Sequence, residues 1–364
     1  MKIVFYSNFM NHHQYGLCNE LRRLGADLKF VESTPIPDEQ KNLGYYTYDD
    51  DFILKDNENT HSHIYSLIMD ADAVIFGSKP YDLFVDRVNS GRLTFNFSER
   101  LFKKSALQSL FAPINIQLKR KYVFNKKNAP YLLCAGGFVA YDYKKLGYPA
   151  DKCLKWGYFP GYTEVEYDEI KSKKRKASII WVGRFISWKH PEYIVDLANY
   201  LKSQGLYFKI KMIGDGPLRS DIERQISEKD LGDYIELMGP KSPDEVRKEF
   251  EMAEIAAITS DRNEGWGAVV NEAMGAGCAV VACDKIGSVS YLIGDGNNGL
   301  IYRNKKEFLH SVESLLLDDH KKGALAMNAF ATIQNEWNYK TAAERLTMFI
   351  RERKIFEKGP VSKG

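Results

Sequence analysis

Cysteine, long apolar runs and net charge are all scarce in this chain of 364 residues. The five cysteines are scattered, odd in number and without a CxxC pair, which excludes a disulfide scaffold and a cysteine zinc site. No apolar run reaches the 18 residues that a membrane helix needs. Because 51 Lys and Arg nearly balance 48 Asp and Glu, a general affinity for nucleic acid is not expected. With no charged leader before the first apolar stretch, these features predict a cytoplasmic protein, and a peripheral position at the inner face of the membrane depends on the basic segment described below.

The chain is too long for one hydrophobic core, which stops growing at roughly 250 to 300 residues. Residues 164–176 are charged throughout and have no apolar period, so they are expected to form a linker. We therefore expect a first domain over 1–163 and a second over 177–336. Residues 337–364 would form a helix that crosses back to the first domain, followed by a frayed tail over 359–364.

Short runs rich in β-branched and aromatic residues alternate with segments of helical period, a pattern typical of βα units around parallel sheets. The runs before the charged stretch are 2–6, 27–31, 73–76, 93–97, 131–134 and 153–157, and those after it are 178–183, 208–213, 234–238, 255–258, 279–282 and 299–302. The predicted fold class is α/β, with two Rossmann-like doubly wound parallel-sheet domains that face each other across a cleft. Ligands of such folds bind at the carboxyl ends of the strands.

The most informative stretch runs from Glu264 to Glu272, two carboxylates eight residues apart. If a helix begins near Gly267, Glu264 lies in the preceding loop and Glu272 just over one turn inside it. Gly265 and Gly267 would leave the N–H groups of this helix start open to an anion such as a phosphate. The alternative is a plain loop with Glu272 solvated, but a carboxylate on the otherwise apolar helix 268–274 needs a partner, so we favour a site.

A second signal surrounds Gly183, Arg184 and Lys189. Arg184 leaves the end of a predicted strand, and Lys189 precedes a helix start, where a cation is disfavoured unless an anion lies nearby. Two cations converging on one point suggest a diphosphate, although both could instead pair with surface carboxylates. The turn at Gly214 has only a weak G-x-G pattern, which argues against a dinucleotide oxidoreductase.

In their order and spacing, Gly183-Arg184, Lys189, Gly214-Asp-Gly-Pro217, Met238-Gly239 and Glu264-x7-Glu272 are similar to the second domain of the retaining glycosyltransferases of family 4, which have the GT-B fold. This resemblance covers residues 177 to about 303. In the first domain, the phrases SNFMNHHQ, LTFNFSERLFKK and KWGYFPG resemble a subset of that family that builds capsules and exopolysaccharides.

The resemblance implies a nucleotide-diphosphate sugar, with UDP or GDP as the nucleotide, and no bound metal or other cofactor. Arg184 and Lys189 would contact the diphosphate, Glu272 the ribose and Glu264 the donor sugar. Backbone atoms would make the other contacts. Those of Gly239, Pro240 and Lys241 would contact the base, and those of Trp266, Gly267, Ala268 and Val269 would contact the phosphates.

The first domain departs from the family pattern in two places. Many relatives have a glycine pair after the first strand, whereas here the loop reads SNFMNHHQ. Many also place a histidine after the fourth strand, where this chain has Glu99 and Arg100. Either Glu99 with Arg100 or His13 could substitute for that histidine. Asn11 could equally cap the first helix and leave His13 merely solvated.

Residues 100–150 carry ten Lys or Arg against one acid, Asp142. Apolar residues interleave with this basic segment, namely Leu101, Phe102, Leu107, Leu110 and Phe111. Such a segment could meet an anionic membrane surface or a lipid-diphosphate acceptor, or it could be a solvated face whose apolar residues pack inward.

The sequence thus predicts a retaining, metal-independent hexosyltransferase of polysaccharide biosynthesis that acts on a glycan or a lipid-linked oligosaccharide. The alternatives are a nucleotide-sugar epimerase of the same fold and a non-catalytic nucleotide-sugar-binding regulator.

Overall fold

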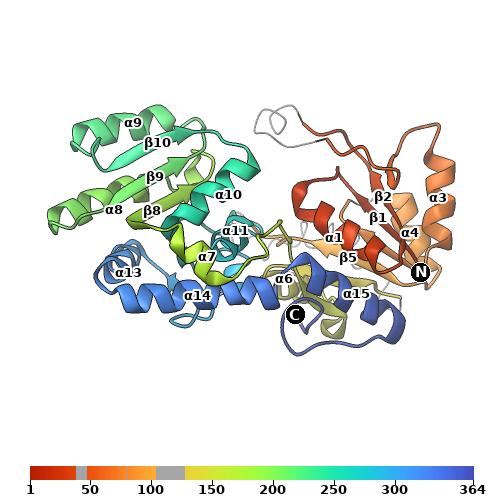
Figure 1. Ribbon diagram of the computed structural model, residues 1–364. Coiled ribbons are helices and arrows are strands. Elements are labelled where there is room, and N and C mark those ends of the chain that lie inside the picture. Colours follow the sequence, from red (N-terminus) through yellow and green to blue (C-terminus); the bar gives the residue numbers. More distant parts are fainter. Residues whose placement is uncertain (38–46, 79, 104–127) are drawn as a thin grey trace. The chain divides into compact units, whose positions relative to one another are not determined.

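The computed structural model describes residues 1–37, 47–78, 80–103 and 128–364. The chain divides into two compact units, which are drawn in Figure 1. Unit 1 comprises Met1–Gly161 together with Trp337–Gly364, and unit 2 comprises Tyr162–Glu336. The last 28 residues therefore return to the unit that the first residues begin.

Unit 1 is built on a seven-stranded sheet whose order is β3-β2-β1-β4-β5-β6-β7. All of its strand pairs are parallel, with Lys2 of β1 in register with Asp27 and Ile3 with Ala73. The strands are β1 (Lys2–Ser7), β2 (Asp27–Glu32), β3 (Ile53–Lys55), β4 (Ala73–Phe76), β5 (Thr94–Ser98), β6 (Tyr131–Ala135) and β7 (Cys153–Trp156). The six strands expected in this half are confirmed, and β3 is an addition.

The described residues of unit 1 form the helices α1 (His12–Arg23), α3 (His61–Asp70), α4 (Tyr81–Asn89), α6 (Val139–Lys145) and α15 (Tyr339–Glu352). Asn11 caps α1, since its Oδ1 accepts the N–H of His13 at 3.0 Å. Helix α15 packs on α1, where a side chain at Gly16 would meet the ring of Tyr339 at 3.1 Å. The last 28 residues are thus tied to the start of the chain by helix packing.

The tail after α15 is ordered by backbone hydrogen bonds to β7. The N–H of Lys155 donates to the Ser362 carbonyl at 2.7 Å, and the N–H of Val361 donates to the Lys155 carbonyl at 2.9 Å. Val361 and Ser362 are fully buried. The expected frayed end is therefore wrong, because this segment pairs with the edge strand of the sheet.

Unit 2 contains a six-stranded parallel sheet in the order β10-β9-β8-β11-β12-β13. Its strands are β8 (Arg175–Val182), β9 (Lys209–Ile213), β10 (Ile235–Gly239), β11 (Ala253–Ile258), β12 (Ala279–Cys283) and β13 (Leu300–Tyr302). All six expected strands of this half are confirmed. Because β8 lies between β9 and β11, the strand order reverses beside β8, where ligands of doubly wound sheets bind at the carboxyl ends.

Helices precede, connect and follow these strands, and several are labelled in Figure 1. They are α7 (Tyr167–Ser172), α8 (Glu192–Ser203), α9 (Arg219–Glu228), α10 (Pro243–Met252), α11 (Val269–Gly275), α12 (Val289–Leu292), α13 (Lys305–Leu317) and α14 (Asp319–Asn335). A capping box starts α10, where Ser242 and Glu245 satisfy each other's backbone N–H groups. None of the helices in the described part of the chain has both the length and the apolarity to cross a bilayer.

The segment 164–176 is not a structureless linker, because it contains α7 and the start of β8 and lies in unit 2. Ile170 anchors α7 with a fully buried side chain. Lys174 lies between α7 and β8, and its Nζ donates to three backbone carbonyls of the same unit, those of Phe250 (3.1 Å), Ala253 (2.7 Å) and Ala276 (2.7 Å). The charged composition of this segment gives no indication of this packing.

Candidate active site

Two loops of unit 2, which follow the adjacent strands β8 and β11, are cross-linked at the carboxyl end of the sheet. Thr259 Oγ1 donates to the Lys189 carbonyl at 2.5 Å and accepts from Trp181 Nε1 at 2.8 Å. The N–H of Asp261 donates to the Trp188 carbonyl at 2.8 Å. These bonds fix the backbone from which the Lys189 side chain projects.

Lys189 and Glu264 form an ion pair across these two loops. The two side chains are only 16% and 17% exposed, so water screens the pair less than it would at the surface. The structure thus brings together two residues that the sequence assigned to the donor from separate motifs. The carboxylate with which Lys189 pairs therefore belongs to the candidate site.

Glu272 of α11 lies within the electrostatic reach of the same lysine. Burial raises the pKa of its carboxyl group to about 7, and the positive charges of Arg247 and Lys189 oppose that rise. The carboxyl group is screened from water although the residue as a whole is only partly buried. The expectation that this carboxylate is not a plainly solvated surface group therefore agrees with its environment.

Arg184 lies on the loop after β8 that also carries Lys189. Its side chain is exposed, and the guanidinium carbon is 5.8 Å from the centre of the Trp188 ring. An exposed guanidinium at the carboxyl end of a central strand is placed to meet an anionic ligand.

The turns after β8, β9 and β10 pack backbone against backbone. The N–H of Gly183 donates to the Ile213 carbonyl, and the N–H of Gly214 donates to the Gly239 carbonyl, both at 3.0 Å. A Cβ on Gly214 would lie 2.0 Å from the Gly183 carbonyl oxygen, and φ there is +131°, so only glycine fits. Pro240 and Lys241 follow β10 at this same edge of the sheet.

The residues before α11 form a tightly packed turn, in which Gly265, Trp266 and Gly267 are all buried. Trp266 is 1% exposed, and its Nε1 donates to Asn271 Oδ1 at 2.8 Å, so its side chain belongs to the core. Gly267 has φ +83°, and a Cβ there would lie 2.6 Å from a methyl of Ile286. The turn is completed by the other predicted phosphate contacts, Gly265, Ala268 and Val269, the last of which begins α11.

Unit 1 has its own cavity, of about 250 Å³, at the carboxyl ends of β1, β4 and β5. Polar and aromatic side chains line it, among them Ser7, Asn8, Glu99 and Tyr158. Glu99 accepts from Tyr158 OH at 3.3 Å and pairs with Lys103 at 2.6 Å. The cavity is suited to hydroxyl groups, because carboxylate, amide and hydroxyl side chains meet there.

His13 lies in the first turn of α1 and lines a smaller cavity of unit 1 together with Ser7 and Trp156. Burial lowers the pKa of His13 well below its ordinary value, and the nearby His12 acts in the same direction. Asn11 does cap α1, but His13 is half-buried and not merely solvated. Its proposed role at the donor sugar stays a prediction.

Arg100 differs from Glu99, its partner in the sequence prediction, because it turns into the unit. Its guanidinium carbon lies 4.3 Å from the centre of the Phe138 ring, and its Nε is 4.0 Å from Asp142 Oδ2. The side chain is 8% exposed and does not line the cavity that Glu99 lines. Stacking and the buried carboxylate explain this inward direction.

The basic segment of unit 1 begins with residues that pack inward. Phe102 is 2% exposed, and Leu101 packs against a buried cluster with Leu132 and Val139. For these two residues, the interpretation as a solvated basic face with inward apolar residues agrees with the structure. Lys103, Lys144 and Lys145 of this segment are exposed or partly exposed. Its remaining members lie outside the described residues, namely Lys104, Leu107, Leu110, Phe111, Lys119, Arg120, Lys121, Lys126 and Lys127.

Sequence reasoning missed the residues that hold the loops of unit 2 together, Thr259, Asp261 and His190. His190 contacts Glu192 at 2.7 Å and Asp261 at 3.4 Å. Their signal was available, because Thr259 and Asp261 directly follow the predicted strand 255–258, as Arg184 follows the strand 178–183.

Residues 164–332 match the family described as glycosyl transferases group 1. Alpha-D-kanosaminyltransferase of Streptomyces kanamyceticus is 29% identical over 195 residues, which are 52% of this chain and 50% of that protein. The putative colanic acid biosynthesis glycosyltransferase WcaL of Escherichia coli (strain K12) is 22% identical over 57% of this chain and 53% of that protein. The chain thus spans about half the length of these curated relatives.

Among solved structures, HepE of Anabaena in complex with UDP is similar with a TM-score of 0.71. The likeness covers 96% of this chain and 100% of that chain at 14% sequence identity. At that identity the structural likeness is evidence for the fold alone. Together with the two doubly wound sheets, it confirms the GT-B fold class.

Proposed function

We propose that this chain is a retaining hexosyltransferase that uses a nucleotide-diphosphate sugar, because residues 164–332 match the glycosyl transferases group 1 family. The observation that carries this proposal is the ion pair of Lys189 and Glu264, held at the carboxyl end of the sheet in unit 2. The relatives support it, since one is a kanosaminyltransferase, one is a putative colanic acid glycosyltransferase and the structural neighbour holds UDP.

On this proposal, Arg184 and Lys189 neutralise the diphosphate as it leaves. The bond between the anomeric carbon and the diphosphate oxygen breaks, and the acceptor oxygen bonds to that carbon on the same face. The acceptor proton passes to an oxygen of the leaving phosphate. Fixed cations stabilise the charge that develops on the leaving group, so catalysis comes mainly from positioning and electrostatics.

The rest of unit 2 would bind the donor without reacting. Glu264 accepts hydrogen bonds from hydroxyl groups of the donor sugar, and Glu272 accepts hydrogen bonds from the ribose hydroxyl groups. Backbone groups at Gly239, Pro240 and Lys241 meet the base, which would be that of UDP or GDP.

The cavity of unit 1 is our candidate for the acceptor sugar. Asn8, Ser98 and Glu99 offer hydrogen bonds to hydroxyls, and Phe97 and Tyr158 offer aromatic faces to a sugar ring. The acceptor would be a glycan or a lipid-linked oligosaccharide of polysaccharide biosynthesis, met at the cytoplasmic face of a membrane.

The test is turnover of UDP- and GDP-sugars with a panel of glycan acceptors, compared among wild type, Lys189→Ala and Glu264→Ala. Each substitution is expected to lower turnover at least about tenfold, because one charge-assisted contact contributes about 1.5 to 3 kcal/mol. Lys306→Ala removes an exposed lysine of α13 and is expected to leave turnover unchanged.

Near-normal turnover in both variants, with thermal melts like that of wild type, would refute the proposal. NMR of the donor incubated alone tests the alternatives. Conversion of the sugar without an acceptor would indicate an epimerase, and binding without conversion or transfer would indicate a regulator.

A further inference from the structure

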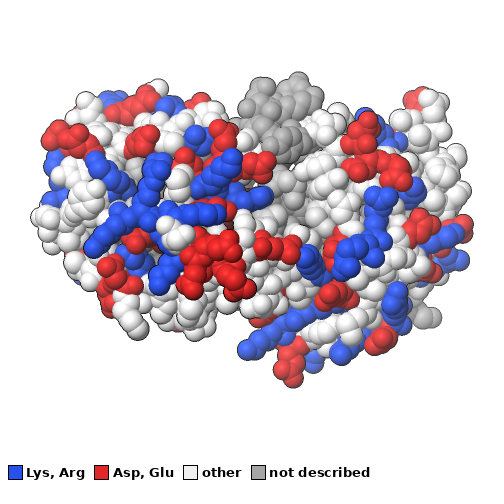
Figure 2. Space-filling view, in the orientation of Figure 1, with Lys and Arg blue, Asp and Glu red and all other residues white. Residues whose placement is uncertain are grey.

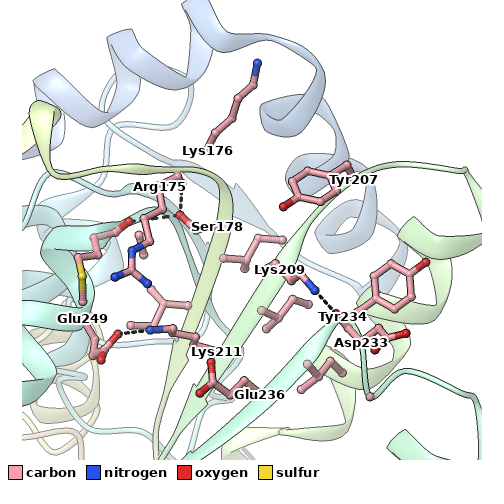
Figure 3. Close-up of a pocket in the computed structure, with 17 residues that line it drawn as sticks. Arg175, Lys176, Ser178, Tyr207, Lys209, Lys211, Asp233, Tyr234, Glu236 and Glu249 are labelled. Atoms are coloured by element: carbon pink, nitrogen blue, oxygen red, sulfur yellow. Dashed lines mark hydrogen bonds and ion pairs between the residues drawn. The ribbon is translucent and has the colours of Figure 1, made fainter.

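Unit 2 has a second cavity, of about 460 Å³, at the amino ends of its strands. Its walls come from the first residues of β8, β9 and β10 and from the end of α10 (Figure 3). Strand β8 runs from Arg175 at this cavity to Val182 next to the candidate active site, so roughly 20 to 25 Å separate the two. The volume lies within the range of roughly 300 to 1,000 Å³ that small-molecule sites occupy.

The cavity has a positive end. Arg175 and Lys176 open β8, and Lys209 opens β9 one strand away, in register with Ser178. Within the part of the chain that the structure describes, none of these three cations forms an ion pair with a carboxylate. Lys209 instead donates to the backbone carbonyl of Asp233 (Figure 3).

The other end of the cavity is neutralised. Lys211 pairs with Glu249 at 2.7 Å, and Glu236 lies in register with Lys211 on the neighbouring strand. Because Asp233 also lines the cavity, four Lys or Arg side chains face three carboxylates there, which leaves one positive charge in excess. Figure 2 shows Lys and Arg side chains gathered on one face of unit 2, beside a group of Asp and Glu side chains at the position of α7.

Aromatic side chains line the cavity beside its positive end. Tyr207, just before β9, is 72% exposed, and its hydroxyl points toward the cavity in Figure 3. Tyr234 lines the cavity one strand further along, and Ile179, Ile210 and Ile235 are its apolar lining. A large aromatic side chain left in water beside cationic side chains is typical of a ligand site.

We propose that this cavity binds a small molecule that joins a phosphate to a planar or sugar ring. The phosphate would be bound by Lys209, with Lys176 on the same face of the sheet, and the ring would lie against Tyr207. Charge-assisted bonds to phosphate suit these cations, and the concave shape favours a small ligand over a flat membrane surface. The site is separate from the donor site and does not depend on the function proposed above.

The test is a calorimetric titration of the full chain with phenyl phosphate, which carries both a phosphate and a ring. We expect one saturable site that persists in Arg184→Ala, in which the donor site lacks a cation. Lys209→Ala should weaken this binding at least about tenfold, and the exposed Lys306→Ala should leave it unchanged. Inorganic phosphate should bind more weakly than phenyl phosphate, because it lacks the ring.

Tyr207→Ala is a second variant with little risk to the fold, because that side chain is mostly in water. It should weaken phenyl phosphate binding about threefold or more and leave inorganic phosphate unaffected. Equal binding by Lys209→Ala and Lys306→Ala would overturn the proposal, as would binding that disappears in Arg184→Ala. Sedimentation with phosphatidylglycerol vesicles that depends on Lys209, without phenyl phosphate binding, would overturn it in favour of a membrane surface.

Discussion

Gly214 offers the sharpest test of how the candidate active site is built, because its backbone touches the neighbouring turn. A Cβ there would lie 2.0 Å from the Gly183 carbonyl oxygen, and φ is +131°. Gly214→Ala must therefore either push the turns after β8 and β9 apart or change the backbone conformation. Both responses disturb the hydrogen bond from Gly214 N–H to the Gly239 carbonyl.

The expected loss of stability can be worked out from these contacts. A positive φ costs a residue with a Cβ roughly 1 to 2 kcal/mol, and a lost backbone hydrogen bond about 1 kcal/mol. Because the overlap exceeds 1 Å, relief of the clash adds a similar amount, giving about 3 to 4 kcal/mol. For a unit the size of unit 2, 1 kcal/mol shifts the melting temperature by about 2 to 4 °C. Gly214→Ala should therefore melt about 6 to 16 °C lower.

The assay is a thermal melt with Gly205→Ala as the matched control. Gly205 lies in the same unit and also has a positive φ, of +69°, but a Cβ there would meet no atom within 4 Å. Its substitution carries the conformational cost alone, so its melting temperature should fall by only about 2 to 8 °C. If Gly214→Ala melts no lower than Gly205→Ala, the close approach of the two turns does not stabilise the unit and our reasoning is wrong.

Two further predictions concern charged groups of unit 2. Lys174→Met should lower the unfolding free energy in urea by about 3 kcal/mol or more, because it leaves three backbone carbonyls unsatisfied. The control, Lys173→Met, replaces an exposed lysine and should change the unfolding free energy by less than about 1 kcal/mol. Equal effects of the two substitutions would contradict a stabilising role of Lys174. Hydrogen bonds to Glu192 and Asp261 raise the pKa of His190. The stability that protonated His190 contributes to the fold is therefore fully present below pH ~6.5 and is lost as the pH rises through the raised pKa. His190→Gln should therefore lose up to about 1 kcal/mol at pH 6 but little at pH 9 by urea unfolding, and a pH-independent loss would exclude this charge effect.

The strands of both sheets could be predicted because each is a short apolar run between helical segments. The exception is β3, whose three residues include Lys55 and follow a run of aspartates. Three residues are too few to show a period, and β3 is fixed only by its pairing with β2.

The charged segment 164–176 shows why composition misled the prediction. A single buried residue, Ile170, anchors α7, and the half-buried Lys174 is bonded to carbonyls that lie 76 to 102 residues away in sequence. Such long-range partners leave no local pattern. The polar end of a lysine can therefore be held inside a protein where its charge predicts a surface.

The candidate site was predictable in its residue types but not in their directions. Lys189 and Glu264 lie in different motifs, and only the adjacency of β8 and β11 brings them together. Glu99 and Arg100 are neighbours in sequence, yet one lines a cavity and the other stacks on Phe138. Direction depends on the backbone and on partners far along the chain.

The division of unit 1 into two stretches of sequence bears on how the chain folds. Its second stretch, 337–364, supplies α15 and the segment that pairs with β7, and a ribosome makes it only after all of unit 2. Contacts so distant in sequence close slowly, because a long loop must be ordered first. Unit 2 can therefore fold while unit 1 still lacks α15, and the edge of β7 stays open to other strands until the last residues emerge.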